Sequence, residues 1–171
     1  ALAAAAVGLL LGETPELIAQ GLVSYQASGM RQNIYEQDGY HIYADCYNAS
    51  PDAMEATLSV LGGMAGDGRR FAVLGSMLEL GDYAEEGHRR AGRAAAQYAD
   101  ALYAYGPDAA AMVAGAKEKG MEHAYAFDDQ TALVAALRED AKKGDALLFK
   151  GSRGMRMERA LAMFLGEEVE A

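Results

Sequence analysis

The sequence predicts an α/β protein with a Rossmann-like, mostly parallel sheet, helices on both faces, an N-terminal β-hairpin and a short helical segment before it. The first observation is the alternation of short β-branched or aromatic runs with amphipathic segments of about 10–15 residues, which is typical of βαβ units. The second is the pair Asp38-Gly39 between two such runs, a strong signal for a tight hairpin. The third is a hydrophobic fraction of 51% in 171 residues, enough for the core of one ordinary domain.

The start of the chain is expected to form two short helices within residues 1–27. The second helix has Thr14 as a good N-cap, Pro15 at its first helical position and Gly21 as a plausible stop. Ser28-Gly29 then marks a flexible joint.

The rest of the chain alternates strands and helices. The expected strands cover residues 32–37, 40–44, 70–74, 101–105, 123–127 and 146–150. The expected helices cover residues 51–63, 83–98, 108–119, 129–142 and 155–165. Right-handed crossovers would bring the strand ends after Leu74, Tyr105, Phe127 and Phe149 to one edge of the sheet.

The composition excludes several classes of protein. The formal charge of −10, from 15 basic and 25 acidic residues, argues against nucleic acid or an anionic membrane as a partner. The single cysteine, Cys46, excludes an intramolecular disulfide and a cysteine metal cluster, and we interpret it as a buried, inert thiol. His41, His88 and His123 lie far apart without ligand spacing, so no metal site is expected from them.

The apolar start of the chain indicates a piece of a longer protein, and the usual triphosphate-binding motif does not occur in it. The apolar run over residues 1–11 is shorter than the roughly 20 residues that a membrane span needs, and we interpret it as the remainder of a buried helix. No G-x-x-x-x-G-K-[ST] loop occurs, so nothing in this chain is expected to hold a triphosphate by the usual backbone loop.

Three polar segments follow predicted strands and carry the candidate chemistry. Residues 45–54 read DCYNASPDAM, residues 75–81 read GSMLELG and residues 150–158 read KGSRGMRME. The first segment places an acid, an amide and a hydroxyl where a strand ends and a helix begins, which is where open α/β sheets bind ligands. In the third, glycines flank Ser152 and Arg153, so backbone and side chains can approach an anionic group closely.

In this order and at these distances, the three segments resemble the C-terminal domain of the Mur ligases, over nearly the whole chain. The resemblance implies that residues 28–171 are this domain and that residues 1–27 are the C-terminal remnant of the central ATP-binding domain. Two positions depart from the usual family pattern: Ser50 replaces Asn, and Ser76 replaces Asp.

The resemblance implies a nucleotide-binding group of Arg31, Asp45 and Asn48. Asp45 would contact the ATP ribose, and Arg31 would reach ATP across the interdomain cleft. The residues alone leave structural alternatives open. Asp45 can satisfy loop amides, Arg31 can be a solvated joint residue, and Asn48 can bond its own turn.

The resemblance also implies a substrate-binding group of Lys150, Ser152 and Arg153 at the active-site cleft. A serine with an arginine suits the free carboxylate of a dipeptide. Which of the three residues contacts the dipeptide is left open, and Lys150 can instead cap its strand. No catalytic or metal-binding residue is assigned. Glu79 is interpreted as part of a structural turn, and His88, which matches a family histidine, as a solvated or capping helix residue.

The reaction implied by the resemblance is an ATP-dependent ligation in cytoplasmic peptidoglycan synthesis. ATP would phosphorylate the terminal carboxylate of UDP-N-acetylmuramoyl tripeptide, and the amine of D-alanyl-D-alanine would attack the acyl phosphate. Mg²⁺ and the phosphate-binding loop would belong to the missing central domain, so this chain alone would be inactive. The missing N-terminal and central domains would be its partners.

Two alternatives stay open. A sister ligase that adds another amino acid, or a glutamate tail to folate, would share the fold, although the LELG and KGSR segments favour the dipeptide-adding member. A non-catalytic module of the receiver type would need an aspartate at the end of the central strand, where Gly106-Pro107 stands.

Overall fold

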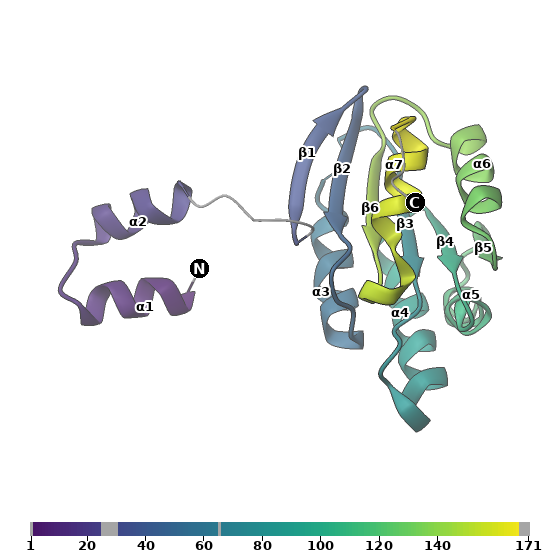
Figure 1. Ribbon diagram of the computed structural model, residues 1–171, viewed down its shortest axis with the longest axis horizontal. Helices are drawn as coiled ribbons and strands as arrows, with labels where there is room; N and C mark the ends of the chain where they lie inside the picture. Colours follow the sequence, from purple (N-terminus) through teal and green to yellow (C-terminus); the bar gives the residue numbers. More distant parts are fainter. Residues whose placement is uncertain (1, 25–30, 65, 168–171) are drawn as a thin grey trace.

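The computed structural model describes residues 2–24, 31–64 and 66–167. Within these ranges the chain forms seven α-helices and one six-stranded sheet of order β1-β2-β6-β3-β4-β5 (Figure 1). β1 pairs antiparallel with β2, and every other neighbouring pair is parallel. The predicted α/β class and the mostly parallel sheet are therefore confirmed.

The bounds of the elements lie within two residues of those expected from the sequence. The strands are β1 (Asn33–Gln37), β2 (Tyr40–Asp45), β3 (Arg70–Gly75), β4 (Ala101–Tyr105), β5 (Ala124–Phe127) and β6 (Ala146–Lys150). The helices are α1 (Leu2–Leu10), α2 (Pro15–Val23), α3 (Pro51–Leu61), α4 (Ala84–Tyr98), α5 (Ala109–Glu118), α6 (Gln130–Asp140) and α7 (Met157–Leu165). Two short 3₁₀ helices, η1 (Gly81–Tyr83) and η2 (Arg153–Met155), precede α4 and α7.

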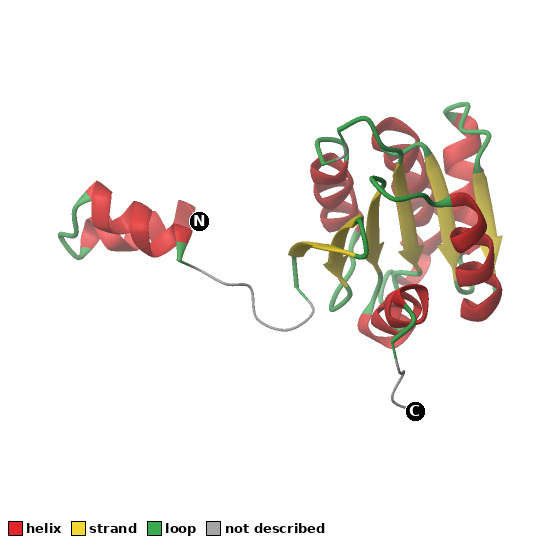
Figure 2. Cartoon of the chain, turned by 90° about the horizontal axis from the view of Figure 1, so that it is seen from above, coloured by secondary structure: helices red, strands yellow, loops and turns green. Residues whose placement is uncertain are grey.

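Helices cover both faces of the sheet (Figure 2). On one face, α3, α4 and α5 pack through residues such as Leu58, Ala95 and Met112. On the other face, α6 and α7 pack through residues such as Leu137 and Phe164. Because β2, β6, β3 and β4 are buried from both sides, the sheet is a rigid base for the loops at its ends.

The carboxyl ends of the parallel strands meet at one edge, as predicted. Asp45 pairs in register with Lys150, Leu74 also pairs with Lys150, and Gly75 pairs with Tyr105. The segments after β2, β3 and β6 therefore start at one level of the sheet, although β2 and β6 are separated by about a hundred residues of chain. This edge is where an open α/β sheet binds ligands.

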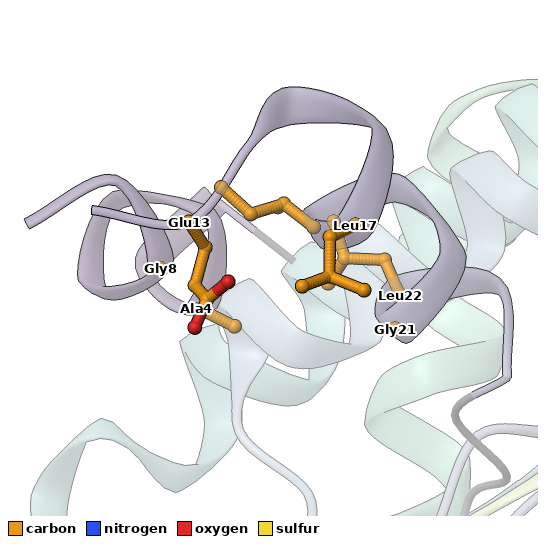
Figure 3. A pocket seen from close by; sticks show the side chains of 7 residues that line it. Ala4, Gly8, Glu13, Leu17, Gly21 and Leu22 are labelled. Carbon is orange, nitrogen blue, oxygen red and sulfur yellow. The ribbon is translucent and has the colours of Figure 1, made fainter. Parts of the chain in front are cut away.

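The two short helices predicted at the start of the chain are present, and they form a hairpin with Gly8 of α1 facing Ile18 of α2. A cavity of about 530 Å³ lies between them (Figure 3). It is lined by Ala4, Gly8, Glu13, Leu17, Ile18, Gly21 and Leu22. The joint predicted at Ser28-Gly29 lies outside the described residues. In the described part of the chain, no helix has the length and apolarity that crossing a membrane requires.

Candidate functional site

The turn after β2 is ordered by the helix that follows it. Ser50 is the N-cap of α3, since its Oγ accepts a hydrogen bond from the amide of Ala53 at 3.3 Å, and Pro51 takes the first helical position. The serine that departs from the family pattern therefore fills the capping role that an asparagine also fills. This capped start fixes the short segment between Asp45 and α3.

Asp45 and Lys150 form a buried ion pair at the ends of β2 and β6. Lys150 Nζ lies 2.5 Å from Asp45 Oδ2 and 2.8 Å from the carbonyl oxygen of Asn48. Asp45 Oδ1 also accepts a hydrogen bond from the Gln32 amide at 3.2 Å. Lys150 is 2% exposed and Asp45 8% exposed, so the pair holds the strand ends and the turn together away from bulk water.

A pocket of about 380 Å³ opens beside this pair. Its lining residues are Arg31, Gln32, Asp45, Tyr47, Asn48, Ala53 and Lys150. The Arg31 guanidinium carbon lies 4.0 Å from the centroid of the Tyr47 ring, which is a cation–π contact. The structure thus brings Arg31, Asp45 and Asn48 around one pocket, together with Lys150, which the sequence grouped with the other segment.

The Asn48 side chain also satisfies its own turn, because its Oδ1 accepts a hydrogen bond from the amide of Ala49 at 2.9 Å. Tyr47 was not singled out from the sequence. Its position between Asp45 and Asn48 in the same strand-end segment was the available signal.

Ser152 and Arg153 lie in the loop after β6 and do not line this pocket. Ser152 is 8% exposed, and its Oγ accepts a hydrogen bond from the Leu78 amide at 3.0 Å. Arg153 is more open, with 53% of its side chain exposed, and forms an ion pair with Glu158 at the start of α7. The three residues expected to bind substrate are therefore divided between two places on the same edge.

The expectation that His88 is solvated or capping was wrong, because His88 is 0% exposed. Its Nε2 accepts a hydrogen bond from the Met77 amide at 2.8 Å, and its Nδ1 lies 2.6 Å from the carbonyl oxygen of Ala84. The charged neighbours of His88 in the sequence lie on the outer side of α4, whereas the ring points under the segment after β3. Glu79, by contrast, is exposed in a turn, as expected.

Cys46 is a free, fully buried thiol, as expected. Burial, helped by the negative charges of Glu158 and Asp45, raises the pKa of the Cys46 thiol to about 12. A thiol with so high a pKa is not a nucleophile near neutral pH. Among the described residues there is also no cluster of three or more His, Cys, Asp or Glu side chains that can hold a metal ion.

A doubly covered, mostly parallel sheet with a polar pocket at its carboxyl edge defines an α/β domain of the class that binds ligands at its strand ends. Residues 30–153 match the family described as Mur ligase, glutamate ligase domain, and the chain belongs to this family.

Among its relatives, the UDP-N-acetylmuramoyl-tripeptide–D-alanyl-D-alanine ligase of Bacillus subtilis is 38% identical over 161 residues, which cover 92% of this chain and 35% of that protein. The ligase of the same name from Escherichia coli is 34% identical and covers 94% of this chain and 35% of that protein. The crystal structure of the MurF ligase from Thermotoga maritima in complex with ADP superimposes with a TM-score of 0.80 at 33% identity, covering 95% of this chain and 36% of that one. The chain therefore spans about a third of the length of the relatives that it matches.

Proposed function

We propose that this chain is the C-terminal domain of a longer ATP-dependent ligase that joins D-alanyl-D-alanine to UDP-N-acetylmuramoyl tripeptide through an acyl phosphate. The observation that carries the proposal is the match to ligases of that name at 34–38% identity over at least 92% of this chain, with the pocket at the expected strand end. A sister ligase of the same family remains the alternative.

The nucleotide end of the proposed site is the pocket beside Asp45. A carboxylate has about four acceptor positions, and the contacts to Lys150 and Gln32 use two of them. Asp45 can therefore accept a ribose hydroxyl while its ion pair stays intact. Arg31 supplies a planar cation at the mouth of the same pocket, which suits a phosphate group of ATP. Asn48 fixes the turn between them and offers its amide group.

The substrate end of the proposed site is the loop after β6. Arg153 presents a half-exposed guanidinium. Ser152 uses an acceptor position for Leu78 and keeps its hydroxyl proton to donate to a carboxylate. Together they suit the terminal carboxylate of D-alanyl-D-alanine. Lys150 would act here through its position at the base of the loop, between this end and the nucleotide pocket.

We also propose that residues 28–171 form this C-terminal domain and that residues 1–27 belong to the central ATP-binding domain of the longer protein. The helical hairpin supports the division, because Leu10, Leu11 and Val23 are each more than 70% exposed around an apolar cavity. Such a surface is expected to pack against further protein.

Mg²⁺ is proposed to bind in the missing domains. The contribution proposed for this chain is to bind ATP and the dipeptide and to exclude water from the acyl phosphate. We expect the longer enzyme to work in the cytoplasm, where its nucleotide substrates are made.

The test is ATP-dependent phosphate release by the full-length protein with UDP-N-acetylmuramoyl tripeptide and D-alanyl-D-alanine, with this chain assayed beside it. We expect release by the full-length protein only, and loss of release when the dipeptide is omitted. Release with a different amine, but not with D-alanyl-D-alanine, would move the protein to a sister ligase.

A further inference from the structure

The buried ring of His88 is fixed by two backbone groups whose roles cannot change. The Met77 amide can only donate a hydrogen bond, and it donates to Nε2 at 2.8 Å. The Ala84 carbonyl can only accept one, and it lies 2.6 Å from Nδ1. The ring therefore carries its proton on Nδ1 and presents the lone pair of Nε2 to the segment after β3. The contact of Nε2 with Asp108 Oδ2, at 3.7 Å, is then a secondary one.

The segment held by His88, residues 76–78, is bonded in turn to the loop after β6. The Leu78 amide donates to Ser152 Oγ at 3.0 Å, and the Ser152 amide donates to the Ser76 carbonyl at 3.2 Å. Ser76 Oγ accepts a further bond from the Asp108 amide at 3.1 Å, which adds the loop after β4. One partly buried polar network thus joins the ends of β3, β4 and β6.

Close packing also couples the two loops. A Cβ on Gly151 would lie 3.1 Å from Gly75 Cα and 2.8 Å from Met157 Cγ. A Cβ on Gly154 would lie 2.7 Å from a side-chain carbon of Leu78. The glycines of the two loop segments therefore let the backbones come into close contact, so a shift of residues 76–78 displaces residues 151–154.

We propose that His88 is a positioning residue for the loop of residues 151–154. By holding Met77, it fixes the amide of Leu78 that orients the hydroxyl of Ser152. The inference rests on the proposed function, in which Ser152 and Arg153 bind the carboxylate of D-alanyl-D-alanine. The hydrogen bonds of this network include neither the Asp45–Lys150 pair nor the Arg31–Tyr47 contact. Disrupting the network should therefore weaken binding of the dipeptide more than binding of ATP.

The first experiment needs no variant and no activity. In the ¹⁵N NMR spectrum of this chain, the His88 ring should show a protonated Nδ1 and an unprotonated Nε2 coupled across the hydrogen bond to the Met77 amide. A ring with its proton on Nε2 would overturn the proposal, because Met77 would then have no acceptor there.

The second experiment compares His88→Leu and His88→Gln in this chain by amide hydrogen exchange. Leucine removes the acceptor, so the amides of Met77, Leu78 and Ser152 should exchange at least about tenfold faster, relative to those of β4. Glutamine can present an amide oxygen to Met77 and should restore most of the protection. Equal exchange at Met77 and Leu78 in His88→Leu and the unaltered chain would overturn the proposal.

The third experiment measures KM in the full-length protein. His88→Leu should raise KM for D-alanyl-D-alanine about tenfold and change KM for ATP less than about twofold, and His88→Gln should reverse most of the effect. The control is Thr57→Val, another buried polar helix residue, whose hydroxyl donates within α3 to Ala53. If His88→Leu raises both KM values equally, or if Thr57→Val raises KM for D-alanyl-D-alanine as much as His88→Leu does, the role of His88 is structural only.

The outcomes separate the two proposals. If the unaltered full-length protein does not use D-alanyl-D-alanine, the proposed function fails, and the spectrum and exchange data alone decide whether His88 holds the loop. If the protein uses the dipeptide but His88→Leu leaves its KM unchanged, the function stands and the positioning role is overturned.

Discussion

Lys150 Nζ lies 2.5 Å from Asp45 Oδ2, and this ion pair joins the ends of β6 and β2. Both side chains are almost fully buried, and each makes one further hydrogen bond: Lys150 donates to the Asn48 carbonyl, and Asp45 accepts from the Gln32 amide. The charge of a fully desolvated lysine is tolerated only because the carboxylate faces it. The pair therefore shapes the pocket that we propose for the nucleotide.

The first prediction concerns the stability of this pair. Asp45→Ala leaves Lys150 buried without a counter-charge, so the free energy of unfolding should fall by about 3 kcal/mol in urea denaturation of this chain. The double variant Asp45→Ala/Lys150→Met removes both charges and should recover at least half of that loss.

The surface pair Arg89–Glu85 provides the control. The Glu85 side chain is 72% exposed, so Glu85→Ala should leave the free energy of unfolding nearly unchanged. If the double variant is as unstable as Asp45→Ala, the loss does not arise from an unpaired lysine.

The second prediction concerns Arg31 and Tyr47. In the full-length protein, Arg31→Ala should raise KM for ATP at least about tenfold, since it would remove the proposed charged contact to the nucleotide. Tyr47→Leu should raise this KM about threefold, because the ring no longer orients the guanidinium. In the Arg31→Ala background the same Tyr47 change should have almost no effect.

Tyr83 is a matched control, since it is 47% exposed and Tyr47 is 44% exposed, and Tyr83→Leu should leave KM for ATP unchanged. Additive effects of Arg31→Ala and Tyr47→Leu would show that the two side chains act independently. Unchanged ATP kinetics in Arg31→Ala would remove this arginine from the site.

The sequence predicted the sheet well because local signals agreed with the fold. The hairpin at Asp38-Gly39 forms with φ values of 54° and 88°, as a tight turn of this type requires. Asp45 was identified because a strand end followed by a capped helix is a local pattern. The Asp45–Lys150 pair was not predicted, because it depends on the register of β2 against β6, which no local pattern encodes.

The burial of His88 was missed for a different reason. Glu85, Glu86, Arg89 and Arg90 surround it in the sequence, and their charges favour an exposed helix face. The helical period places His88 with Ala91 and Ala95, three and seven residues further on, and all three are 0% exposed. Giving the helical period more weight than the charged residues beside His88 predicts that its ring is buried.

The third prediction is a pH dependence that depends on Asp140. Arg69 reaches both carboxylate oxygens of Asp140, at 2.7 and 3.3 Å, and Tyr103 donates a hydrogen bond at 3.0 Å. The Arg69 guanidinium, with a smaller contribution from Tyr103, holds the pKa of Asp140 below its ordinary value of 3.8 despite the opposing effect of burial.

Because the folded state has the lower pKa, the unfolded chain takes up the proton first as the pH falls. The stabilisation of the folded state by ionised Asp140 is therefore complete above the ordinary pKa of this carboxyl, and it is lost as the pH falls through the lower pKa of the folded state. In urea denaturation, the free energy of unfolding should fall less between pH 6 and about pH 2.5 in Asp140→Asn than in the unaltered chain. If the free energy of unfolding falls equally with pH in both proteins, the pH dependence does not arise from Asp140. Glu122→Gln, at an exposed acid, is the control.

The last prediction concerns Cys46, the only cysteine of the chain. Its Sγ–H donates to the Phe149 carbonyl at 3.4 Å, and burial raises the pKa of the thiol to about 12. At pH 8 only about one thiol in ten thousand would be ionised, against about one in ten at the ordinary pKa of 9.0. A disulfide reagent should therefore label the folded chain at least about a thousandfold more slowly than the urea-unfolded chain. Since Cys46 is 0% exposed beside Asp45, the labelling rate of the folded chain should rise in Asp45→Ala, which weakens the adjoining strand ends, and not in Glu85→Ala. Fast labelling of the folded, unaltered chain at pH 8 would show that the thiol is accessible and would contradict its placement in the core.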